Sequence, residues 1–598
     1  MHQTKTHTML ARLLQAGAAA VTLLAAAQSH AAAPGITGPA FNLQAHDGFV
    51  NQPDGEQVYT WGYGCNGSPT GFAPAGIAGA NCPNMQLPAP TLIVTEGQSV
   101  AVTLTNNLPP AAGNTSILFP GFQVTAAAAA SQPATCAAST PLVQGVLTSE
   151  VANGCAVTYT FTASSPGTRA YYSGTQSDLQ IEMGLYGAII VLPANVPAAC
   201  TGGLAAQNRI AAAHWGEGDY RLSQAAYDHP KSCYDREYLF QFAEMDGNIH
   251  SVAYQQVLAA QAAGCATSAS AGTTGCGLQV PTEPYHPSFF VINGRSMPDD
   301  MDGNYASQYP NQPYNGNPHM HPGEQVLLRI VGQGRWEHPF HEHANHVRVL
   351  ARDGNLLLSP SGALSGILMF TTDTFPGQAM DGIFYYTGRG LNWDMYGHNP
   401  TSTDPLATLA CTPDAYGYNT GFPATDLSYS TAPNQAVASQ VNYYEWCQDH
   451  NKPLEVAPYG DVNAGGPATL PNANIFTNGA WYSGSPYLGP DATLRATTVL
   501  NSVGAGVGTG MQQVSSGCVT GTTDVTNTNG TVVGAAATPY CTNLQPANIQ
   551  ANPSNERAFA FMWHSHNERE ITTNNVFPGG MFMMMLVDSR EFQIDESN

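Results

Sequence analysis

The feature that most restricts the fold is a series of short segments rich in β-branched residues, each ending at Gly, Pro or Asn. They alternate between apolar and polar residues or run continuously apolar, and both patterns are typical of β-strands. The segments are TLIVTEGQSVAVTLTNNL, AVTYTFTA, LYGAIIVLP, EYLFQFAEM, SFFVING, EQVLLRIVG and HVRVLARDG. Helical periodicity is scarce, with SVAYQQVLAAQAAG as the best candidate. The pattern predicts an all-β protein built from β-sandwich domains.

A chain of 598 residues is too long for one hydrophobic core, so several units are expected. The strand-rich segments predict a first sandwich at 34–196 and a second at 203–394. Residues 395–553 are loop-like and rich in Gly, Thr and Asn, and are either an insertion or part of a third domain. A short strand-forming segment follows at 554–598.

The first 33 residues are typical of a secretory signal peptide. Lys5 and Arg12 precede a short apolar stretch, and small residues offer cleavage after about Ala31 or Ala33. No later segment is long and apolar enough to predict a membrane-spanning helix. We therefore expect export to the periplasm, the cell surface or the medium.

The cysteines fit an oxidising compartment, because an even number in an exported chain favours disulfides and none lies in a CxxC motif. The 12 cysteines fall into six close pairs, for which we expect local bridges. The pairs are Cys65 and Cys82, Cys136 and Cys155, Cys200 and Cys233, Cys265 and Cys276, Cys411 and Cys447, and Cys518 and Cys541.

The charge balance argues against one class of partner. The net charge is −23 with only 10% charged residues, so there is no basic surface to bind nucleic acid.

Histidine is concentrated in two places. WEHPFHEHANHVRVLARDG holds His338, His341, His343 and His346, and FMWHSHNERE holds His564 and His566. In a strand, residues two apart point to the same side, so each HxH pair presents two imidazoles together. A third HxH, His319 and His321 in GNPHMHPGEQ, lies in an expected loop, where a solvent-facing or copper-loading role is predicted.

Four segments resemble the multicopper oxidases, whose domains are cupredoxin sandwiches with Greek-key topology. HPFHEHANHVRVLARDG is similar to the HPFHLHGH line of the family, and WHSHNEREITTNNVFPGGM resembles its final HCH segment. GTRAYYSGTQSDLQIEMGLYGAIIV and TSILFPGFQV have the frames of its first-domain histidine motifs. The HSHNERE…FPGGM segment is closest in pattern to a divergent bacterial, manganese-oxidase-like branch. The resemblance implies tandem cupredoxin-like sandwiches, with the long Cys-rich stretch as an insertion or third domain.

The resemblance also implies a thiolate-bound copper that accepts electrons and a three-copper cluster with eight histidines. Here the first-domain ligand positions are occupied by Leu118 and Pro120 in one frame and by Tyr172 and Gly174 in the other. Ser565 occupies the position of the thiolate cysteine, and Glu570 falls near a further histidine position. Neither the blue copper site nor the three-copper cluster is therefore expected.

The remaining histidines are sufficient for a smaller centre. We predict a metal site from His338, His341, His343, His564 and His566, holding one copper ion, although manganese, iron or zinc would also suit parts of this ligand set. Tyr172 and Glu570 are candidate catalytic residues, Tyr172 as a ligand or redox phenol and Glu570 as a carboxylate for a harder metal. Each also has an interpretation without a chemical role. Tyr172 would then be a packing residue, and Glu570 would be part of a solvated acidic turn.

Two functions follow. The first is an exported copper protein that performs one-electron oxidation of a small phenol or a metal ion, with ligands drawn from a neighbouring subunit or supplied within one chain. The second is a non-catalytic extracellular protein that reuses the cupredoxin frame for copper holding, assembly or surface structure. Self-assembly or a homo-oligomer is compatible with either function. The sequence leaves open whether the protein is an enzyme.

Overall fold

The computed structural model describes residues 33–136, 141–201, 217–265, 276–321, 324–344, 346–385 and 558–588, together with Ile594 and two short strands. The predicted signal peptide, apart from Ala33, lies outside the described residues. So do the predicted bridges Cys411–Cys447 and Cys518–Cys541 and nearly all of 395–553. Within 395–553 the structure describes β23 (Val525–Thr526) paired with β24 (Val532–Val533).

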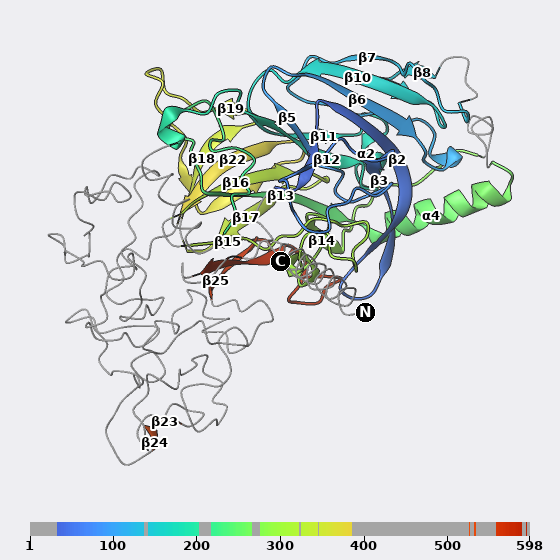
Figure 1. Ribbon diagram of the computed structural model, residues 1–598. Helices are drawn as coiled ribbons and strands as arrows, with labels where there is room; N and C mark the ends of the chain where they lie inside the picture. Colours follow the sequence, from blue (N-terminus) through green and yellow to red (C-terminus); the bar gives the residue numbers. More distant parts are fainter. Residues whose placement is uncertain are drawn as a thin grey trace, which may run out of the picture.

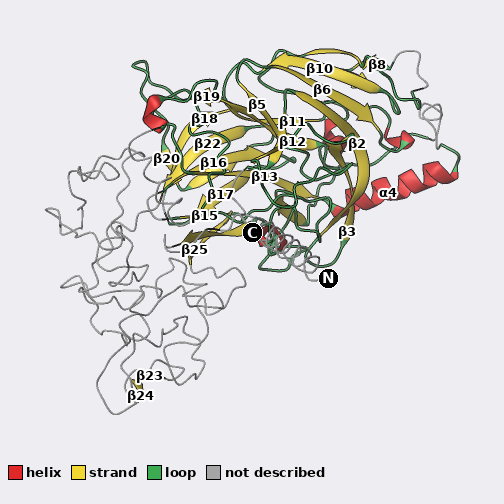
Figure 2. Ribbon diagram, viewed as in Figure 1, coloured by secondary structure: helices red, strands yellow, loops and turns green. Residues whose placement is uncertain are grey.

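The protein is nearly all β, as the strand pattern predicts (Figure 2). The first half folds into two five-stranded sheets and one small hairpin. In order across the first sheet, the strands are β11 (Gly167–Tyr172), β12 (Tyr186–Leu192), β5 (Leu92–Thr95), β1 (Gly35–Thr37) and β4 (Phe72–Ala73). Across the second they are β3 (Gln57–Cys65), β2 (Ala40–Asn51), β6 (Ser99–Asn106), β10 (Ala156–Thr162) and β7 (Thr125–Ala128). The hairpin pairs β8 (Leu142–Gln144) with β9 (Ser149–Val151).

The second half adds two further sheets. The third sheet contains, in order, β14 (Phe289–Ile292), β13 (Arg236–Met245), β16 (Gln325–Gly332), β22 (Ala379–Tyr385), β18 (Val347–Arg352) and β19 (Asn355–Leu356), with β20 (Leu368–Met369) beside β18. The fourth contains β15 (His319–Met320), β26 (Phe582–Asp588), β25 (Ala558–Ser565), β17 (His338–Glu342) and β21 (Thr371–Thr374).

Within the part of the chain that the structure describes, helices are few. They are α2 (Ser177–Gln180), α4 (Gly247–Ala262) and the 3₁₀ turns η1 (Pro110–Ala112), η2 (Ala198–Cys200) and η4 (Asp299–Met301). The side chain of Asp246 caps α4 by accepting from the Asn248 N–H. Helix α4 buries Ile249, Ala253 and Val257 in the core of the first sandwich, although β13, which precedes it, belongs to the second (Figure 1).

Each pair of sheets encloses a core, and the two sandwiches also pack against each other. In β12, Ile189 and Val191 face the first core, whereas Ile190 packs at the junction between the sandwiches against residues that include Val331 of β16. Strand β16 is buried along its whole length for the same reason, because both of its faces are covered. The continuous apolar run of EQVLLRIVG therefore reflects its central position.

The C-terminal segment completes the fourth sheet. Strands β25 and β26 pair with each other, and together they lie between β15 and β17, which come from more than 200 positions earlier in the chain (Figure 1). Met581, Met583 and Met585 face the second core. This pairing brings the two histidine-rich segments together.

Four of the predicted disulfides are present, each between the expected partners: Cys65–Cys82, Cys136–Cys155, Cys200–Cys233 and Cys265–Cys276. Among the described helices, none is both long and apolar enough to cross a membrane.

Candidate metal centre

Strand pairing aligns the two HxH motifs. In the antiparallel ladder of β17 and β25, His341 lies opposite His564, and Phe340 lies opposite Ser565. Phe340 and Trp563 point into the core, so alternation turns the histidines to the other side of the sheet. His341, His343, His564 and His566 thus gather on one face, which we call the four-histidine face.

The imidazole rings on this face are close neighbours. The ring centroids of His341 lie 4.8 Å from His343, 5.0 Å from His566 and 5.6 Å from His564. The Nε2 atoms of His343 and His564 are 3.3 Å apart. Two nitrogen ligands held at 2.0–2.1 Å from one tetrahedral ion would be roughly 3.3 Å apart, so this pair is spaced for a shared metal.

Hydrogen bonds orient these rings. The Nδ1 atom of His564 lies 2.6 Å from the carbonyl oxygen of Ser565, which can only accept, so this nitrogen carries the proton. The lone pair of the neutral ring is therefore on Nε2, facing His343. His341 Nδ1 lies 2.8 Å from Thr371 Oγ1, and the Trp563 indole N–H donates to the His343 carbonyl. Such outer partners fix the direction of metal-binding imidazoles.

The electrostatics favour neutral rings. Burial, followed by the neighbouring imidazoles, lowers the pKa of His343 to about 4. Burial also lowers the pKa values of His341 and His564. Neutral imidazole is the form that binds metal. His564 is buried and His566 is exposed, so the face opens to solvent on one side.

His338 lies apart from this face. It is fully buried, and its Nδ1 and Nε2 atoms lie 2.9 Å from carboxylate oxygens of Glu570 and Glu244 respectively. Burial alone would lower the pKa of His338, but the hydrogen bonds and charges of the two carboxylates outweigh it and raise the pKa to about 9. Both ring nitrogens thus have acidic partners, so neither offers a lone pair to a metal.

Neither of the two candidate catalytic residues is part of the four-histidine face. Glu570 is fully buried against His338 and Ser565. Tyr172 is half-buried at the junction between the sandwiches, where its ring approaches Gly377, and burial raises its pKa. No contact among the described residues joins either side chain to the four histidines.

The replaced first-domain positions face one another. Leu118 and Tyr172 form an isolated β-bridge, and the Leu118 side chain packs against Gly174. A cavity of about 470 Å³ lies beside them, lined by residues that include Phe119, Pro120 and Leu147. Leu118 thus lies against Tyr172 and Gly174 and lines the cavity with Pro120, and no imidazole stands at any of the four replaced positions.

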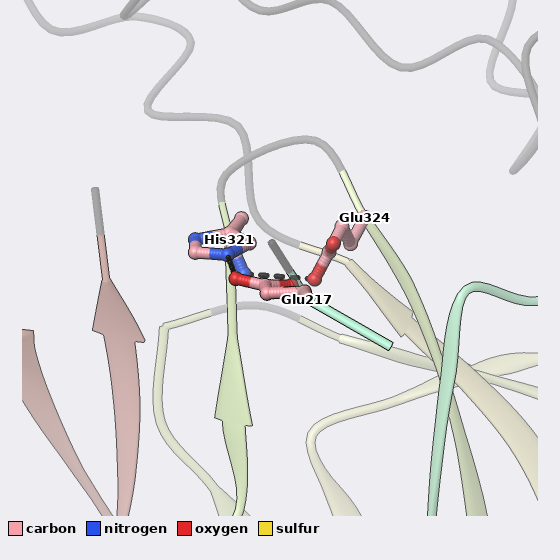
Figure 3. Close-up of side chains that lie close together, drawn as sticks. All are labelled: Glu217, His321 and Glu324. Carbon is pink, nitrogen blue, oxygen red and sulfur yellow. Dashed lines mark hydrogen bonds and ion pairs between the residues drawn. The ribbon is translucent and has the colours of Figure 1, made fainter. Parts of the chain in front are cut away.

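Glu217, His321 and Glu324 form another group of metal-binding side-chain types, with one ligand atom from each within 4.8 Å of the others (Figure 3). On the four-histidine face, no three imidazole nitrogens from different residues all lie within 4.8 Å of one another. However, Arg236 pairs with both carboxylates at 2.5 Å, and the Ile594 N–H donates to Glu217. Because the guanidinium already balances charge here, we interpret the group as a structural ionic cluster.

Sequence reasoning missed Glu244, although a signal exists. It is an acidic residue in EYLFQFAEM, a strand whose residues are all buried. A charge in such a strand requires a partner, and here His338 is that partner.

Comparison with known proteins adds a family match. Residues 78–196 match a family model described as multicopper oxidase. Among solved structures, the chain is similar to the multicopper oxidase mgLAC and to a blue copper oxidase from Nitrosomonas europaea. Each match has 17% identity, covers 58% of this chain and 77% of the other, and has a TM-score of 0.34. A copper nitrite reductase from the same organism matches at 17% identity over 58% of this chain and 85% of its own, with a TM-score of 0.32. No curated protein matches. The matched family segment contains all four replaced first-domain positions.

Proposed function

We propose that this chain, which contains a multicopper oxidase domain at residues 78–196, is an exported copper-binding protein with a single mononuclear site on the four-histidine face. The observation that carries the proposal is the 3.3 Å separation between the Nε2 atoms of His343 and His564. The four disulfides support export, because such bridges persist in oxidising compartments.

The chain's own residues prepare this site for a metal. His343 and His564 would supply the facing pair of nitrogens, and His341 and His566, on the same face, would be the further ligands. An all-imidazole site suits copper, and zinc competes for the same donors. Bound copper would supply one-electron redox chemistry.

The same residues do not fit a four-copper oxidase. The three-copper cluster of the family needs four histidine pairs, and only the two on the four-histidine face remain. The thiolate copper site needs cysteine at the position of Ser565.

The proposed activity is one-electron oxidation of a small phenol or a metal ion that reaches the exposed side of the face, with dioxygen as the final electron acceptor. Phe370 stands there, 55% exposed, with its ring 5.8 Å from the His341 ring. An aromatic substrate would thus meet an aromatic surface beside the histidines, and an incoming metal ion would meet the exposed His566. The alternative is copper holding without turnover, in an assembly or surface protein.

The experiment that tests the site is metal analysis with electron paramagnetic resonance. The exported protein is purified without chelators, loaded with copper and desalted, then compared with a His343→Ala/His564→Ala variant. His346→Ala serves as the matched control, because His346 is exposed near the face but outside it. We expect about one copper per chain, lost in the double variant alone. Equal copper in all three proteins would exclude this site.

Turnover separates the two functions. Copper-loaded protein is supplied with phenols and with Mn²⁺ or Fe²⁺ under air, and oxygen consumption is followed. Oxidation that disappears with the double variant supports the enzyme. Full copper occupancy without oxidation of any of these substrates supports the non-catalytic function.

A further inference from the structure

The buried group beside the four-histidine face has a defined geometry. Glu244 on β13, His338 on β17 and Glu570 after β25 form a carboxylate–imidazole–carboxylate chain with two contacts of 2.9 Å. All three side chains are at most 1% exposed. Glu244 also accepts from the backbone N–H groups of Arg335 and Trp336, which lead into β17.

Glu570 organises the turn that carries His566. Its carboxylate accepts from the Ser565 hydroxyl at 2.5 Å and from the Asn567 side chain at 2.8 Å. Its backbone carbonyl accepts from the Met581 N–H at 2.7 Å, which ties the turn to the start of β26. The path of the chain through HSHNERE is thus held by one buried carboxylate.

This group stands where the family resemblance places the electron-accepting copper. That copper needs a thiolate and two imidazoles with free nitrogens. Here Ser565 and Glu570 stand at two of those positions, and both nitrogens of His338 contact carboxylates. The ligand set does not fit copper, but it satisfies the requirement that a buried charge be paired and hydrogen-bonded.

We infer that Glu244, His338 and Glu570 form a metal-free positioning clamp that aims the His564–His566 pair at the His341–His343 pair. One end of the clamp holds β17, which carries His341, and the other holds the turn that carries His566. The inference rests on the proposed function only for the reason that the two histidine pairs are aligned, which is to bind a metal. The alignment itself is present without a metal. The clamp residues are positioning residues and do not touch the proposed metal.

The test is Glu570→Gln, with Glu324→Gln as the matched control. Glu324 is equally buried and also paired with a cation, but it belongs to the ionic cluster around Arg236. The first measurement is the nuclear magnetic resonance signal of the His564 and His566 rings in metal-free, histidine-labelled protein. We expect both rings to shift in Glu570→Gln and to stay unchanged in Glu324→Gln.

The second measurement is copper affinity with the paramagnetic resonance spectrum. Removing a residue that positions a metal ligand without touching the metal typically lowers metal affinity by about 10–100-fold. We expect this decrease, together with an altered copper signal, in Glu570→Gln and not in Glu324→Gln. If Glu570→Gln does not fold, Asn567→Ala removes one half-buried hydrogen bond to Glu570, together with the bond that Asn567 accepts from the Arg569 N–H, and should shift the same ring signals by less.

The outcomes separate the two proposals. Unchanged ring signals in Glu570→Gln, or in Asn567→Ala if only that variant folds, would overturn the clamp whether or not copper binds. Shifted ring signals in a protein that binds no copper would uphold the clamp and defeat the proposed function. Equal effects in Glu570→Gln and Glu324→Gln would mean general loss of stability, and the positioning role would be wrong.

Discussion

The Nε2 atoms of His343 and His564 lie 3.3 Å apart, although 221 positions separate the two residues in the chain. The contact exists because β17 and β25 are neighbours in one sheet. Two imidazoles at this spacing suit one ion. The His341 ring centroid lies 4.8 Å from that of His343, and the His566 ring centroid lies 5.6 Å from that of His564.

His343→Ala alone removes a direct ligand of the proposed metal. It should therefore weaken copper binding by more than the roughly 10–100-fold that is typical when only a residue hydrogen-bonded to a ligand is lost. The measurement is competition for copper against a chelator of known affinity. His346→Ala should bind like the unmodified protein, and an equal loss in both variants would contradict the assignment.

Copper binding should persist to unusually low pH. Burial and the neighbouring imidazoles lower the pKa of His343 to about 4, so protons compete for this nitrogen only near that pH. We expect occupancy to remain level from pH 7 to about pH 5 and to fall near pH 4. A midpoint close to 6.5, the ordinary imidazole value, would show that the rings are not desolvated as described.

The free energy of unfolding should decrease at alkaline pH, because His338 loses its proton there. The pKa of His338 is raised from 6.5 to about 9, so its stabilising contribution is fully present below pH 6.5 and is lost as the pH rises through 9. His338→Gln should remove this dependence and cost about 3–5 kcal/mol at neutral pH, as expected when a buried ion pair loses one partner.

The measurement is denaturant unfolding of both proteins from pH 6 to pH 10. Buried Glu342, whose pKa burial raises to about 8, titrates in the same range but is common to both, so the difference isolates His338. A difference that does not change between pH 6 and pH 10 would contradict the paired imidazolium.

Ser565→Cys should not create a blue copper site. A thiolate alone is insufficient, since Glu570 replaces an imidazole and His338 contacts carboxylates through both nitrogens. We expect copper-loaded Ser565→Cys to lack the intense visible absorption of a copper–thiolate bond. Strong absorption in this single variant would mean that the clamp opens readily to admit metal.

The disulfides should stabilise in the order of the loops they close. By loop-closure entropy, Cys200–Cys233, with a separation of 33, should contribute about 3.7 kcal/mol, and Cys265–Cys276, with a separation of 11, about 2.8 kcal/mol. Paired Cys→Ser variants compared by chemical unfolding test this, and the reverse order would show that native-state packing dominates.

Local pattern was enough to predict several of the strands and the shared direction of the two histidines within each HxH motif, although β2 and β3 were not among the predicted segments. EQVLLRIVG became β16, and SVAYQQVLAAQAAG fell largely within α4. His341 and His343 share a face because strand alternation is a local property. The disulfides of Cys65 and Cys200 could also be predicted, because their partner cysteines are near in sequence.

The residues that surround His338 could not be predicted from local sequence. Its two partners lie 94 and 232 positions away, and only the packing of β13 and of the turn after β25 brings them to opposite sides of one ring. Glu570 was interpreted through its sequence neighbours, as a solvated turn or a metal carboxylate. Its burial is a tertiary property that no local pattern contains.

The placement of β25 and β26 has a consequence for the order in which the chain is made. At typical synthesis rates of 5–20 residues per second, His564 is polymerised about 10–45 s after His343. During that interval the earlier pair has no facing imidazoles, and the centre of the fourth sheet is missing. The late hairpin therefore completes the fourth sheet and the proposed metal site together, so an ion that needs both histidine pairs could bind only after β25 has paired with β17.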